Sequence, residues 1–500
     1  MSAAPHAPRS LGEQLRRRKP IVFRHEHHEG QELARNLSTF QLTMFGVGAT
    51  VGTGIFFVLG EAVPKAGPAV LVSFVIAAFA AGLSALCYAE LASAIPVSGS
   101  TYSYAYHSMG ELVAVIIAGC VLLEYGVAAG AVAVGWSGYF NELVHSLFGV
   151  SLPTALTVSP IPGTDGEATG GLINLPAVIL VLLCMLLLMR GASESAKLNA
   201  IMVLIKLGVL TLFAIIGFTA FNADHFSNFF GSGFAGVSAA AGTIFFSFIG
   251  LDAVATAGEE VKNPQKALPR AIIGALVIVS LVYIAVAAAG IAAKPVDFFS
   301  TPEAAEAGLA QILKDITGTE VWSTILAAGA VISIFSVTLV TLYGQTRILF
   351  AIGRDGLIPK RFLEVNPKTM TPTFNTIVVS VIVALIGGFV PADYLWDTVS
   401  IGTLMAFSVV AIGIIIMRRT HPDLERPFKI PGYPVTPILT VLVCGYIMWG
   451  LAGITWVIFF TWIAIVLAFY FFYGRHKATL NTYVDLEEIA EPRGDEEKTK

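Results

Sequence analysis

Twelve long apolar segments recur along the chain, and polar or charged stretches separate them. Each segment is close to the ~20 residues that a helix needs to cross the hydrocarbon core of a bilayer. The segments are too long for the strands of a membrane barrel, which alternate strictly over ~10 residues. The pattern therefore predicts membrane-spanning helices. The predicted spans are 40–63, 68–94, 111–135, 174–190, 196–220, 238–257, 270–292, 322–350, 374–390, 394–417, 434–452 and 454–473.

Composition supports the same class of protein. Apolar residues make up 55% of the 500 residues and charged residues only 13%, whereas a soluble domain carries about 25% charged residues. We therefore predict an all-α polytopic membrane protein. Residues 1–39 should form a cytoplasmic tail, residues 40–473 a twelve-helix domain, and residues 474–500 an acidic cytoplasmic tail. The first of these tails lacks the apolar core of a cleavable signal peptide.

The positive charges predict the orientation. Of the 30 Lys and Arg residues, only Lys65, Lys294 and Lys314 fall in loops on the predicted outer side, and only Lys206 falls deep within a span; the other 26 lie in the tails, in inner loops or at the inner ends of spans. Cytoplasmic loops of membrane proteins carry such an excess of Lys and Arg. Both termini are therefore expected in the cytoplasm, with the chain in the plasma (inner) membrane. A missed or extra helix would reverse the later loops, so the charges also support the number of spans.

Glycine interrupts two of the spans at matching depths. Residues Gly46–Phe56 read GVGATVGTGIF, and Phe245–Asp252 read FFSFIGLD. Each glycine costs roughly 0.8–1 kcal/mol against alanine in a helix interior, and irregular backbone at this depth is tolerated only where it is covered or lines a cavity. Two such spans in corresponding halves of a chain indicate a binding site at the middle of the membrane. Close helix packing on Gly46 and Gly48 is the alternative explanation.

Three ionisable residues are expected near the same depth. Lys206 is about 13 Å into its span at 1.5 Å per residue, in a core of ~30 Å, and Glu124 and Asp252 are also near mid-span. Charges at this depth usually mark substrate pathways or proton relays. Lys206 is too deep to reach the inner surface, whereas Glu124 and Asp252 could be structural pairs or protonated acids. Because desolvation favours a neutral amine, Lys206 is the predicted proton-coupling residue, with Glu124 beside it and Asp252 as a possible third.

Five ordered motifs carry a resemblance to a known family. They are Gly46–Phe56 (GVGATVGTGIF), Ala85–Tyr106 (ALCYAELASAIPVSGSTYSYAY), Leu123–Tyr139 (LEYGVAAGAVAVGWSGY), Phe245–Pro269 (FFSFIGLDAVATAGEEVKNPQKALP) and Gly344–Pro359 (GQTRILFAIGRDGLIP). The chain resembles the amino acid–polyamine–organocation superfamily, and within it the bacterial relatives of the cationic amino acid transporters. The resemblance runs over residues 11–475.

This resemblance implies a LeuT-type fold, in which spans 1–5 and 6–10 form two inverted repeats and two further helices follow. It implies that main-chain N–H groups at the first break hold a substrate α-carboxylate, and that carbonyls of both breaks hold its α-ammonium. It also places Lys206 where sodium-coupled relatives bind their ion, and Glu124 at the acid of the span-3 motif. The expected substrate-binding residues are Thr50, Gly52, Thr53, Gly54, Phe246, Ser247, Ile249 and Leu339.

We therefore expect a proton-coupled symporter that takes up amino acids by alternating access, and not an enzyme. Leu339 in span 8 is expected to shorten the pocket and favour small neutral or a broad range of amino acids. Transport or exchange of cationic amino acids is the alternative, with Glu124 as the nearby anion. A non-transporting amino acid sensor is a more remote alternative. The expected partners are an amino acid, the proton and the bilayer. No cofactor, metal or nucleic acid is expected, and no ATP either, because no nucleotide-binding motif is present.

Other candidate residues have plainer explanations. The acids Glu259 and Glu260 and the basic residues Arg347 and Arg354, at the inner ends of spans 6 and 8, form either a gate of ion pairs or helix caps. His25, His27 and His28 are expected to be solvated rather than metal-binding. The four cysteines are expected to be core residues: Cys87, Cys120, Cys184 and Cys444.

Overall fold

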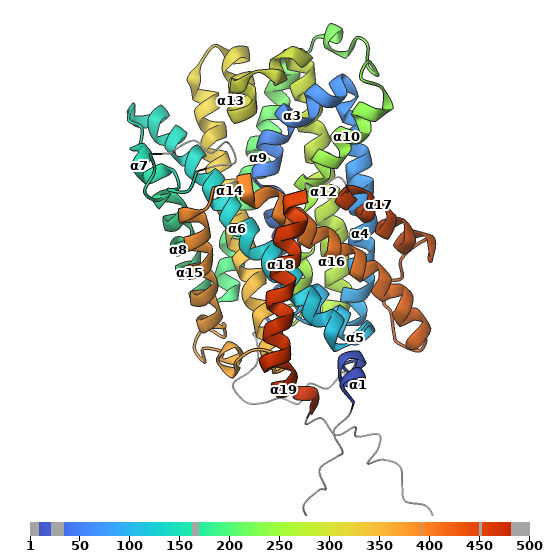
Figure 1. The fold of residues 1–500 in the computed structure, drawn as a ribbon. Coiled ribbons are helices and arrows are strands. Elements are labelled where there is room, and N and C mark those ends of the chain that lie inside the picture. Colours follow the sequence, from blue (N-terminus) through green and yellow to red (C-terminus); the bar gives the residue numbers. More distant parts are fainter. Residues whose placement is uncertain (1–9, 22–34, 163–169, 392, 450–452, 482–500) are drawn as a thin grey trace, which may run out of the picture.

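A computed structural model describes residues 10–21, 35–162, 170–391, 393–449 and 453–481. Long helices stand side by side in one bundle (Figure 1). The first helix, α1 (Leu11–Arg16), and the last, α19 (Arg475–Lys477), both lie at the lower end of the bundle in Figure 1. Two chain ends on the same side are what an even number of crossings produces.

Helices occupy all twelve of the predicted segments. They are α2 (Thr39–Thr50) with α3 (Thr53–Ala66), α4 (Val70–Ala94), α6 (Glu111–Phe148), α8 (Leu175–Met189), α9 (Ala192–Thr219), α10 (Gly233–Phe245) with η3 (Phe246–Phe248) and α11 (Ala253–Thr256), α12 (Pro264–Ala293), α14 (Glu320–Arg354), α15 (Thr373–Phe389), α16 (Asp393–Thr420), α17 (Val435–Trp449) and α18 (Gly453–Phe469). Within the described residues, eight helical stretches are long and apolar enough to cross a membrane, and α8, α15 and α17 are shorter apolar helices. The fold is that of an all-helical, multi-pass membrane protein.

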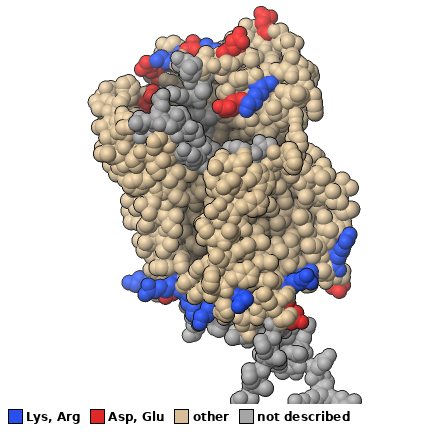
Figure 2. Space-filling model, in the orientation of Figure 1, with Lys and Arg blue, Asp and Glu red and all other residues tan. Residues whose placement is uncertain are grey.

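The surface of the bundle is divided into bands by charge. On the face shown in Figure 2, Lys and Arg gather at the end that carries α1 and α19, and most of the acidic groups lie at the other end. The broad band between them is almost free of charged side chains. Large apolar groups such as Trp449, which is 90% exposed, are left uncovered by protein. An apolar surface of this extent is expected where lipid covers the chain.

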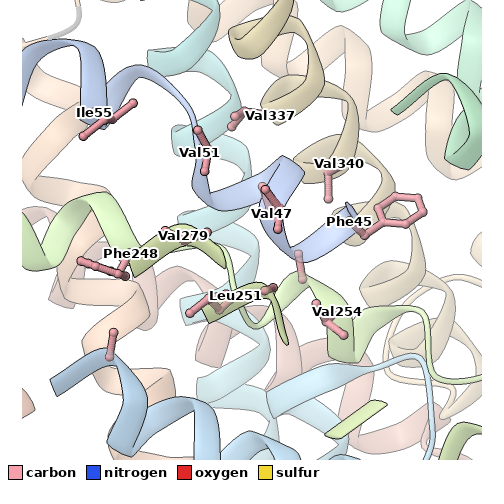
Figure 3. Packing of buried hydrophobic residues seen from close by; sticks show 14 of the residues in the cluster. Phe45, Val47, Val51, Ile55, Phe248, Leu251, Val254, Val279, Val337 and Val340 are labelled. Atoms are coloured by element: carbon pink, nitrogen blue, oxygen red, sulfur yellow. The ribbon is translucent and has the colours of Figure 1, made fainter. Parts of the chain in front are cut away.

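Two helices are interrupted near the centre of the bundle, as the glycine pattern predicts. Residues 51–52 separate α2 from α3, and residues 249–252 lie between η3 and α11. Gly250 has a φ of +108°, a conformation that side-chain-bearing residues rarely adopt. A Cβ atom at Gly250 would also lie 2.8 Å from the carbonyl oxygen of Ala49. Figure 3 shows the two breaks next to each other, with Val51 on one and Leu251 on the other.

The two broken helices are joined through the main chain on the side that carries the termini. The N–H of Leu37, just before α2, donates to the carbonyl of Glu260 at 2.9 Å, and the N–H of Lys262 donates to the carbonyl of Leu37 at 3.0 Å. These bonds form an isolated parallel bridge between Leu37 and Val261. The segments that lead into the first broken helix and out of the second are therefore paired side by side.

Other helices enclose both breaks. α12 packs against α2, α4 and α9, and α14 packs against α2, α6 and α9. The last seven residues of α2, Met44–Thr50, are buried. Protein thus covers the irregular backbone, which satisfies the condition for non-helical chain at membrane depth.

Three helical features differ from the expectation. α5 (Ser100–Ser108) and α13 (Pro302–Thr317) are additional helices, and α6 runs on past residue 135 to Phe148. α5 is rich in Ser, Thr and Tyr, so its hydropathy is low although all nine of its residues are buried. The polar residues Asn141 and Glu142 end the apolar pattern of α6 but not the helix. Apolar length therefore marks the membrane-embedded part of a helix, not the whole helix.

Candidate functional site

A cavity lies where the two breaks meet α6, α14 and α16. Its volume is about 70 Å³, which is room for several water molecules. It is lined by Ala49, Thr50, Gly54, Glu124, Tyr125, Ala128, Val132, Phe246, Ser247, Ile249, Gly250, Asp252, Ala253, Val337, Thr341 and Val399. The two interrupted helices therefore meet at one partly open, mostly apolar space, and concave apolar spaces of this kind commonly bind ligands.

Most of the expected substrate-binding residues lie at this cavity. Its lining includes Thr50, Gly54, Phe246, Ser247 and Ile249. Two expected residues of the first break are not among the lining residues. Gly52 faces α14, where a Cβ atom would lie 2.6 Å from Cγ2 of Val337, and Thr53 begins α3 but its side chain lies outside the described ones.

Leu339 does not line the cavity. It is fully buried in the main hydrophobic core, and Val337 and Thr341 from the same helix line the cavity instead. Residues two apart on a helix are separated by about 200°, whereas residues four apart share a face. The structure therefore places Leu339 on a different face of α14 from Val337 and Thr341, which line the cavity.

The first turn of α3 provides free main-chain donors beside the cavity. Its N-cap, Gly52, makes no side-chain cap, and the first N–H groups of a helix have no partner within the helix. Gly54, in this turn, lines the cavity. Such a helix N-terminus is suited to an anionic group such as a carboxylate.

Lys206 holds the other side of the first break. It is fully buried, and its Nζ donates to the carbonyls of Gly48 at 2.9 Å and Val51 at 2.6 Å. The Ser333 hydroxyl also donates to the Val51 carbonyl, at 3.0 Å. The amine thus lies on the unpaired carbonyls at the end of α2, which favour a cation. In the described part of the chain it has no carboxylate partner, and so it is not paired with Glu124.

Tyr283, on α12, is a residue of this site that the sequence reasoning missed. It is fully buried, and its hydroxyl donates to the carbonyls of Thr50 at 2.9 Å and Ser247 at 3.0 Å. A hydroxyl has one proton, so the two carbonyls, one from each break, share it. A tyrosine in a long apolar segment was the available signal, but it is a common feature of membrane helices.

Glu124 and Asp252 share the cavity as neighbouring acids. Both are buried, and the Tyr125 hydroxyl donates to Oδ2 of Asp252 at 2.7 Å. Oδ1 of Asp252 and Oε2 of Glu124 have no hydrogen-bond partner among the described residues. Because a buried carboxylate oxygen without a partner is costly, this side of the cavity is suited to a proton or a cationic group.

Two ion pairs join separate elements on the side of the bundle that carries the termini. Arg354 donates to both oxygens of Glu259, at 2.9 and 2.8 Å, and Arg347 donates to both oxygens of Glu260, at 2.7 and 3.3 Å. Ser98 adds a main-chain N–H to Glu259 at 3.1 Å. The pairs join the segment after α11 to α14, so they connect different elements and do not cap their own helices.

The environment of Glu259 keeps this carboxyl charged. Burial alone would raise its pKa, but the Arg354 guanidinium and the hydrogen bonds of Arg354 and Ser98 outweigh burial and lower the pKa to about 2. The Glu259–Arg354 pair therefore stays ionised throughout the physiological pH range.

The cysteines and the N-terminal histidines are the remaining candidate residues. The four cysteines are free and buried, as expected for core residues. His25, His27 and His28 lie outside the described residues.

An all-helical bundle with two broken helices around a buried central cavity defines a multi-pass membrane protein of the carrier class. A family model described as amino acid permease matches residues 37–483. The chain belongs to the amino acid permease family, within the superfamily that the five motifs indicate. It is a transporter and not an enzyme.

Two bacterial relatives match over nearly their whole length, and a plant relative matches over about two thirds of its length. The methylthioribose transporter of Bacillus subtilis (strain 168) is 40% identical over 468 residues, which are 93% of this chain and 99% of the relative. The branched-chain amino acid permease BcaP of the same organism is 42% identical over 451 residues, 90% of this chain and 95% of the relative. The vacuolar cationic amino acid transporter 4 of Arabidopsis thaliana is 34% identical over 420 residues, 82% of this chain and 68% of the relative.

Proposed function

We propose that the protein is a proton-coupled symporter that takes up amino acids across the plasma membrane by alternating access. The observation that carries the proposal is the contact of the buried Lys206 amine with the carbonyls of Gly48 and Val51. This contact places a titratable group directly on the first break, next to the cavity. A sodium ion would seek the same carbonyl oxygens, so the lysine takes the place of a bound cation.

The proposed topology has twelve spans in a LeuT-type arrangement, with spans 1–5 and 6–10 as inverted repeats. The permease domain comprises residues 40–473, and residues 1–39 and 474–500 are cytoplasmic tails. Three observations support this proposal: helices occupy all twelve segments, the described chain ends lie on the same side, and Lys and Arg gather there.

In this mechanism the substrate lies between the two breaks. Its α-carboxylate binds the first N–H groups of α3, around Thr53 and Gly54, with Gly52 leading into them. Its α-ammonium binds the carbonyls near Thr50, Phe246 and Ile249, with Ser247 beside them. Phe246 covers the occupied site.

Coupling follows from the charge on Lys206. A protonated amine makes charge-assisted hydrogen bonds to the two carbonyls, which are stronger than those of a neutral amine. Loss of the proton therefore loosens the end of α2, and the cycle can proceed only with proton movement. Glu124 lies in the cavity proposed to bind the substrate. It is proposed to take part in proton coupling together with Lys206, and Asp252 is proposed to assist.

The favoured substrates are small neutral amino acids, or a broad range of them. The cavity is small, and its apolar lining residues include Ala128, Val132, Val337 and Val399. The resemblance to a branched-chain amino acid permease agrees with an apolar side-chain site. Because Leu339 is in the core, we propose that Val337, which lines the cavity, limits the length of the substrate side chain in its place.

Cationic amino acids are the second candidate substrates. The free oxygens of Asp252 and Glu124 would suit a positively charged side chain, and cationic amino acid transporters are among the relatives. A competition profile distinguishes the two candidates. Excess unlabelled lysine and arginine should leave uptake of labelled alanine nearly unchanged if the neutral class is correct, and should suppress it if the cationic class is correct.

Proton coupling is tested by Lys206→Gln in proteoliposomes. With an inward proton gradient, the unaltered protein should accumulate labelled alanine above the outside concentration, and Lys206→Gln should abolish that accumulation. Lys197→Gln is the matched control, because Lys197 is on the same helix but exposed. Proton-driven accumulation by Lys206→Gln at the level of the control would refute the coupling role. Binding without any accumulation by the unaltered protein would instead support a sensor.

A further inference from the structure

An N-terminal segment, residues 10–21, is bound at the inner end of the bundle by groups that the transport site does not use. Ser10 and Glu13 form a capping box that starts α1, and the chain beyond α1 is extended at Arg17. Arg17 and Lys19 turn inward, with side chains 8% and 26% exposed. Arg16 and Arg18, which alternate with them, are exposed.

The first binding group is the carboxylate of Glu111, which is fully buried at the start of α6. Nε of Arg17 donates to Oε2 at 2.6 Å. The hydroxyls of Tyr106 and Tyr470 donate to the same carboxylate, at 2.8 and 2.7 Å. Arg17 also donates to the side chain of Asn481, at 2.7 Å. One acid therefore joins the N-terminal segment to α5, α6 and the C-terminal end of the bundle.

The second binding group is the carboxylate of Asp355, directly after α14. Nζ of Lys19 donates to Oδ1 at 2.5 Å, and the Tyr102 hydroxyl of α5 donates to Oδ2 at 2.7 Å. The main chain of Lys19 is held as well, because its N–H donates to the Tyr106 carbonyl at 3.2 Å and Nδ1 of His107 donates to its carbonyl at 2.8 Å. Hydrogen bonds to both side chain and main chain fix the register of the segment.

The corner before α6 is shaped for this segment. Gly110 has a φ of +108°, and a Cβ atom there would lie 2.7 Å from the carbonyl oxygen of Arg16. A residue with a side chain would therefore push the N-terminal segment away. The corner after α14 has the same property toward the C-terminal segment, because a Cβ atom at Gly356 would lie 2.3 Å from the Lys477 carbonyl oxygen.

The bound segment lies next to the inner ion pairs. Asp355, which binds Lys19, follows Arg354, which binds Glu259. Tyr102 ties α5 to the same Asp355, and the N–H of Ser98, just before α5, binds Glu259. Lys19 therefore fixes the point at which the end of α14, α5 and the segment after α11 are held together.

We propose that residues 10–21 are a cytoplasmic latch, in which Arg17 and Lys19 occupy the carboxylate sites of Glu111 and Asp355 and hold the inner side closed. The inference rests on the proposed alternating access, because a closed inner side must open during each cycle. After release of Lys19, the Asp355 carboxylate keeps only its hydrogen bond from Tyr102. The end of α14, which carries Arg354, is then free to move. Opening to the inside therefore requires the N-terminal segment to leave its two sites.

The latch is tested by thiol labelling at the cavity. Thr341→Cys, in a chain whose four native cysteines are replaced by alanine, reports access to the cavity by a membrane-impermeant maleimide. The label is added at the face that carries the termini, identified with an N-terminal epitope tag. The double variant R17A/K19A should be labelled about tenfold faster, which corresponds to about 1.4 kcal/mol. R16A/R18A removes the same charge from exposed positions and should change the rate less than twofold.

Asp355→Asn provides the test from the other partner, with the N-terminal segment intact and the side-chain shape kept. It should also raise the labelling rate severalfold, and it decides the question if R17A/K19A does not fold. Equal rates in the two double variants, whether both unchanged or both raised, would overturn the latch, as would an unchanged rate in Asp355→Asn. An epitope found outside the cell would refute the proposed orientation, while the comparison of variants would still decide the latch.

Discussion

At the scale of single residues, two buried side chains organise the site by donating to main-chain carbonyls. Lys206 binds Gly48 and Val51, and Tyr283 binds Thr50 and Ser247. Helix breaks leave carbonyl groups without helical partners, and here two neighbouring helices supply the donors. The breaks are thus structural features with fixed partners and not merely irregular chain.

Tyr283→Phe should weaken substrate binding. It removes the donor shared by two buried carbonyls, and a buried group left unpaired costs about 1–3 kcal/mol. We expect the KM for alanine to rise about tenfold. Tyr104→Phe is the matched control, because the buried Tyr104 hydroxyl has no partner among the described residues. Initial uptake rates over a range of alanine concentrations provide the measurement. Equal KM values for the two variants would contradict a role for the shared hydrogen bond.

The residue scale also shows what the sequence could predict. A lysine at mid-span is rare, so Lys206 stands out from charge and depth alone. Tyr283 has no such signal, because its importance depends on which carbonyls it meets. Depth follows from counting residues along a helix, whereas the facing direction depends on how the helix packs. This is why Leu339 was predicted at the cavity while Val337 and Thr341 line it.

At the scale of elements, the close contact of the two breaks depends on glycine. Gly250, on the second break, combines a positive φ with an approach to the Ala49 carbonyl that leaves no room for a Cβ atom. The first break and the second can therefore touch main chain to main chain. The glycine pattern predicted both interruptions, but not that they would be in contact.

Gly250→Ala should destabilise the protein. The strained φ alone costs on the order of 1–3 kcal/mol, and the contact with Ala49 adds to it. Gly242→Ala is the control in the same broken span, since nothing lies within 4 Å of a Cβ atom there and alanine favours a helix interior. Thermal unfolding in detergent should show a lower midpoint for Gly250→Ala and an equal or higher one for Gly242→Ala. Equal midpoints would show that this close contact is unimportant.

Elements outside the bilayer were the least predictable. The polar α5 has no hydropathy signal, yet it is fully buried and carries Tyr102 and Tyr106 to their carboxylates. Its burial comes from contacts with α6, which follows it directly, and with α14 and α16, which are distant in the sequence. High hydropathy marks segments that face lipid. The residues of α5 are polar and are buried by other parts of the protein, so hydropathy does not detect this helix.

At the scale of the whole molecule, two groups that respond to acid, His107 and Glu259, lie on the side that carries the termini, in contact with Lys19 and Arg354. Burial, and secondarily the Lys19 cation, lower the pKa of His107 to about 4 from its ordinary 6.5. Glu259 has a pKa of about 2 against an ordinary 4.5. The all-helical, multi-pass class was predictable at this scale because apolar span length is a property of long stretches, which tolerates small errors in each boundary.

Stability should therefore fall in acid. Between pH 6.5 and 4 the unfolded chain binds a proton at His107 that the folded protein does not, so the free energy of unfolding decreases as the pH falls. At 1.36 kcal/mol per pKa unit, the loss approaches about 3 kcal/mol. Glu259 adds a further loss below pH 4.5, which continues toward pH 2. Unfolding midpoints should fall as the pH is lowered. In His107→Gln the midpoint should depend less steeply on pH between pH 6.5 and 4. The same slope in both proteins would contradict this assignment.

The bridge between Leu37 and Val261 has a mechanical consequence. Because two main-chain hydrogen bonds link the segment before α2 to the segment after α11, the broken helices form a single linkage on the side that carries the termini. Two independent levers would have two degrees of freedom and could open one at a time, leaving a leak. A single linkage has one degree of freedom, so under the proposed alternating access the two broken helices should open together on this side.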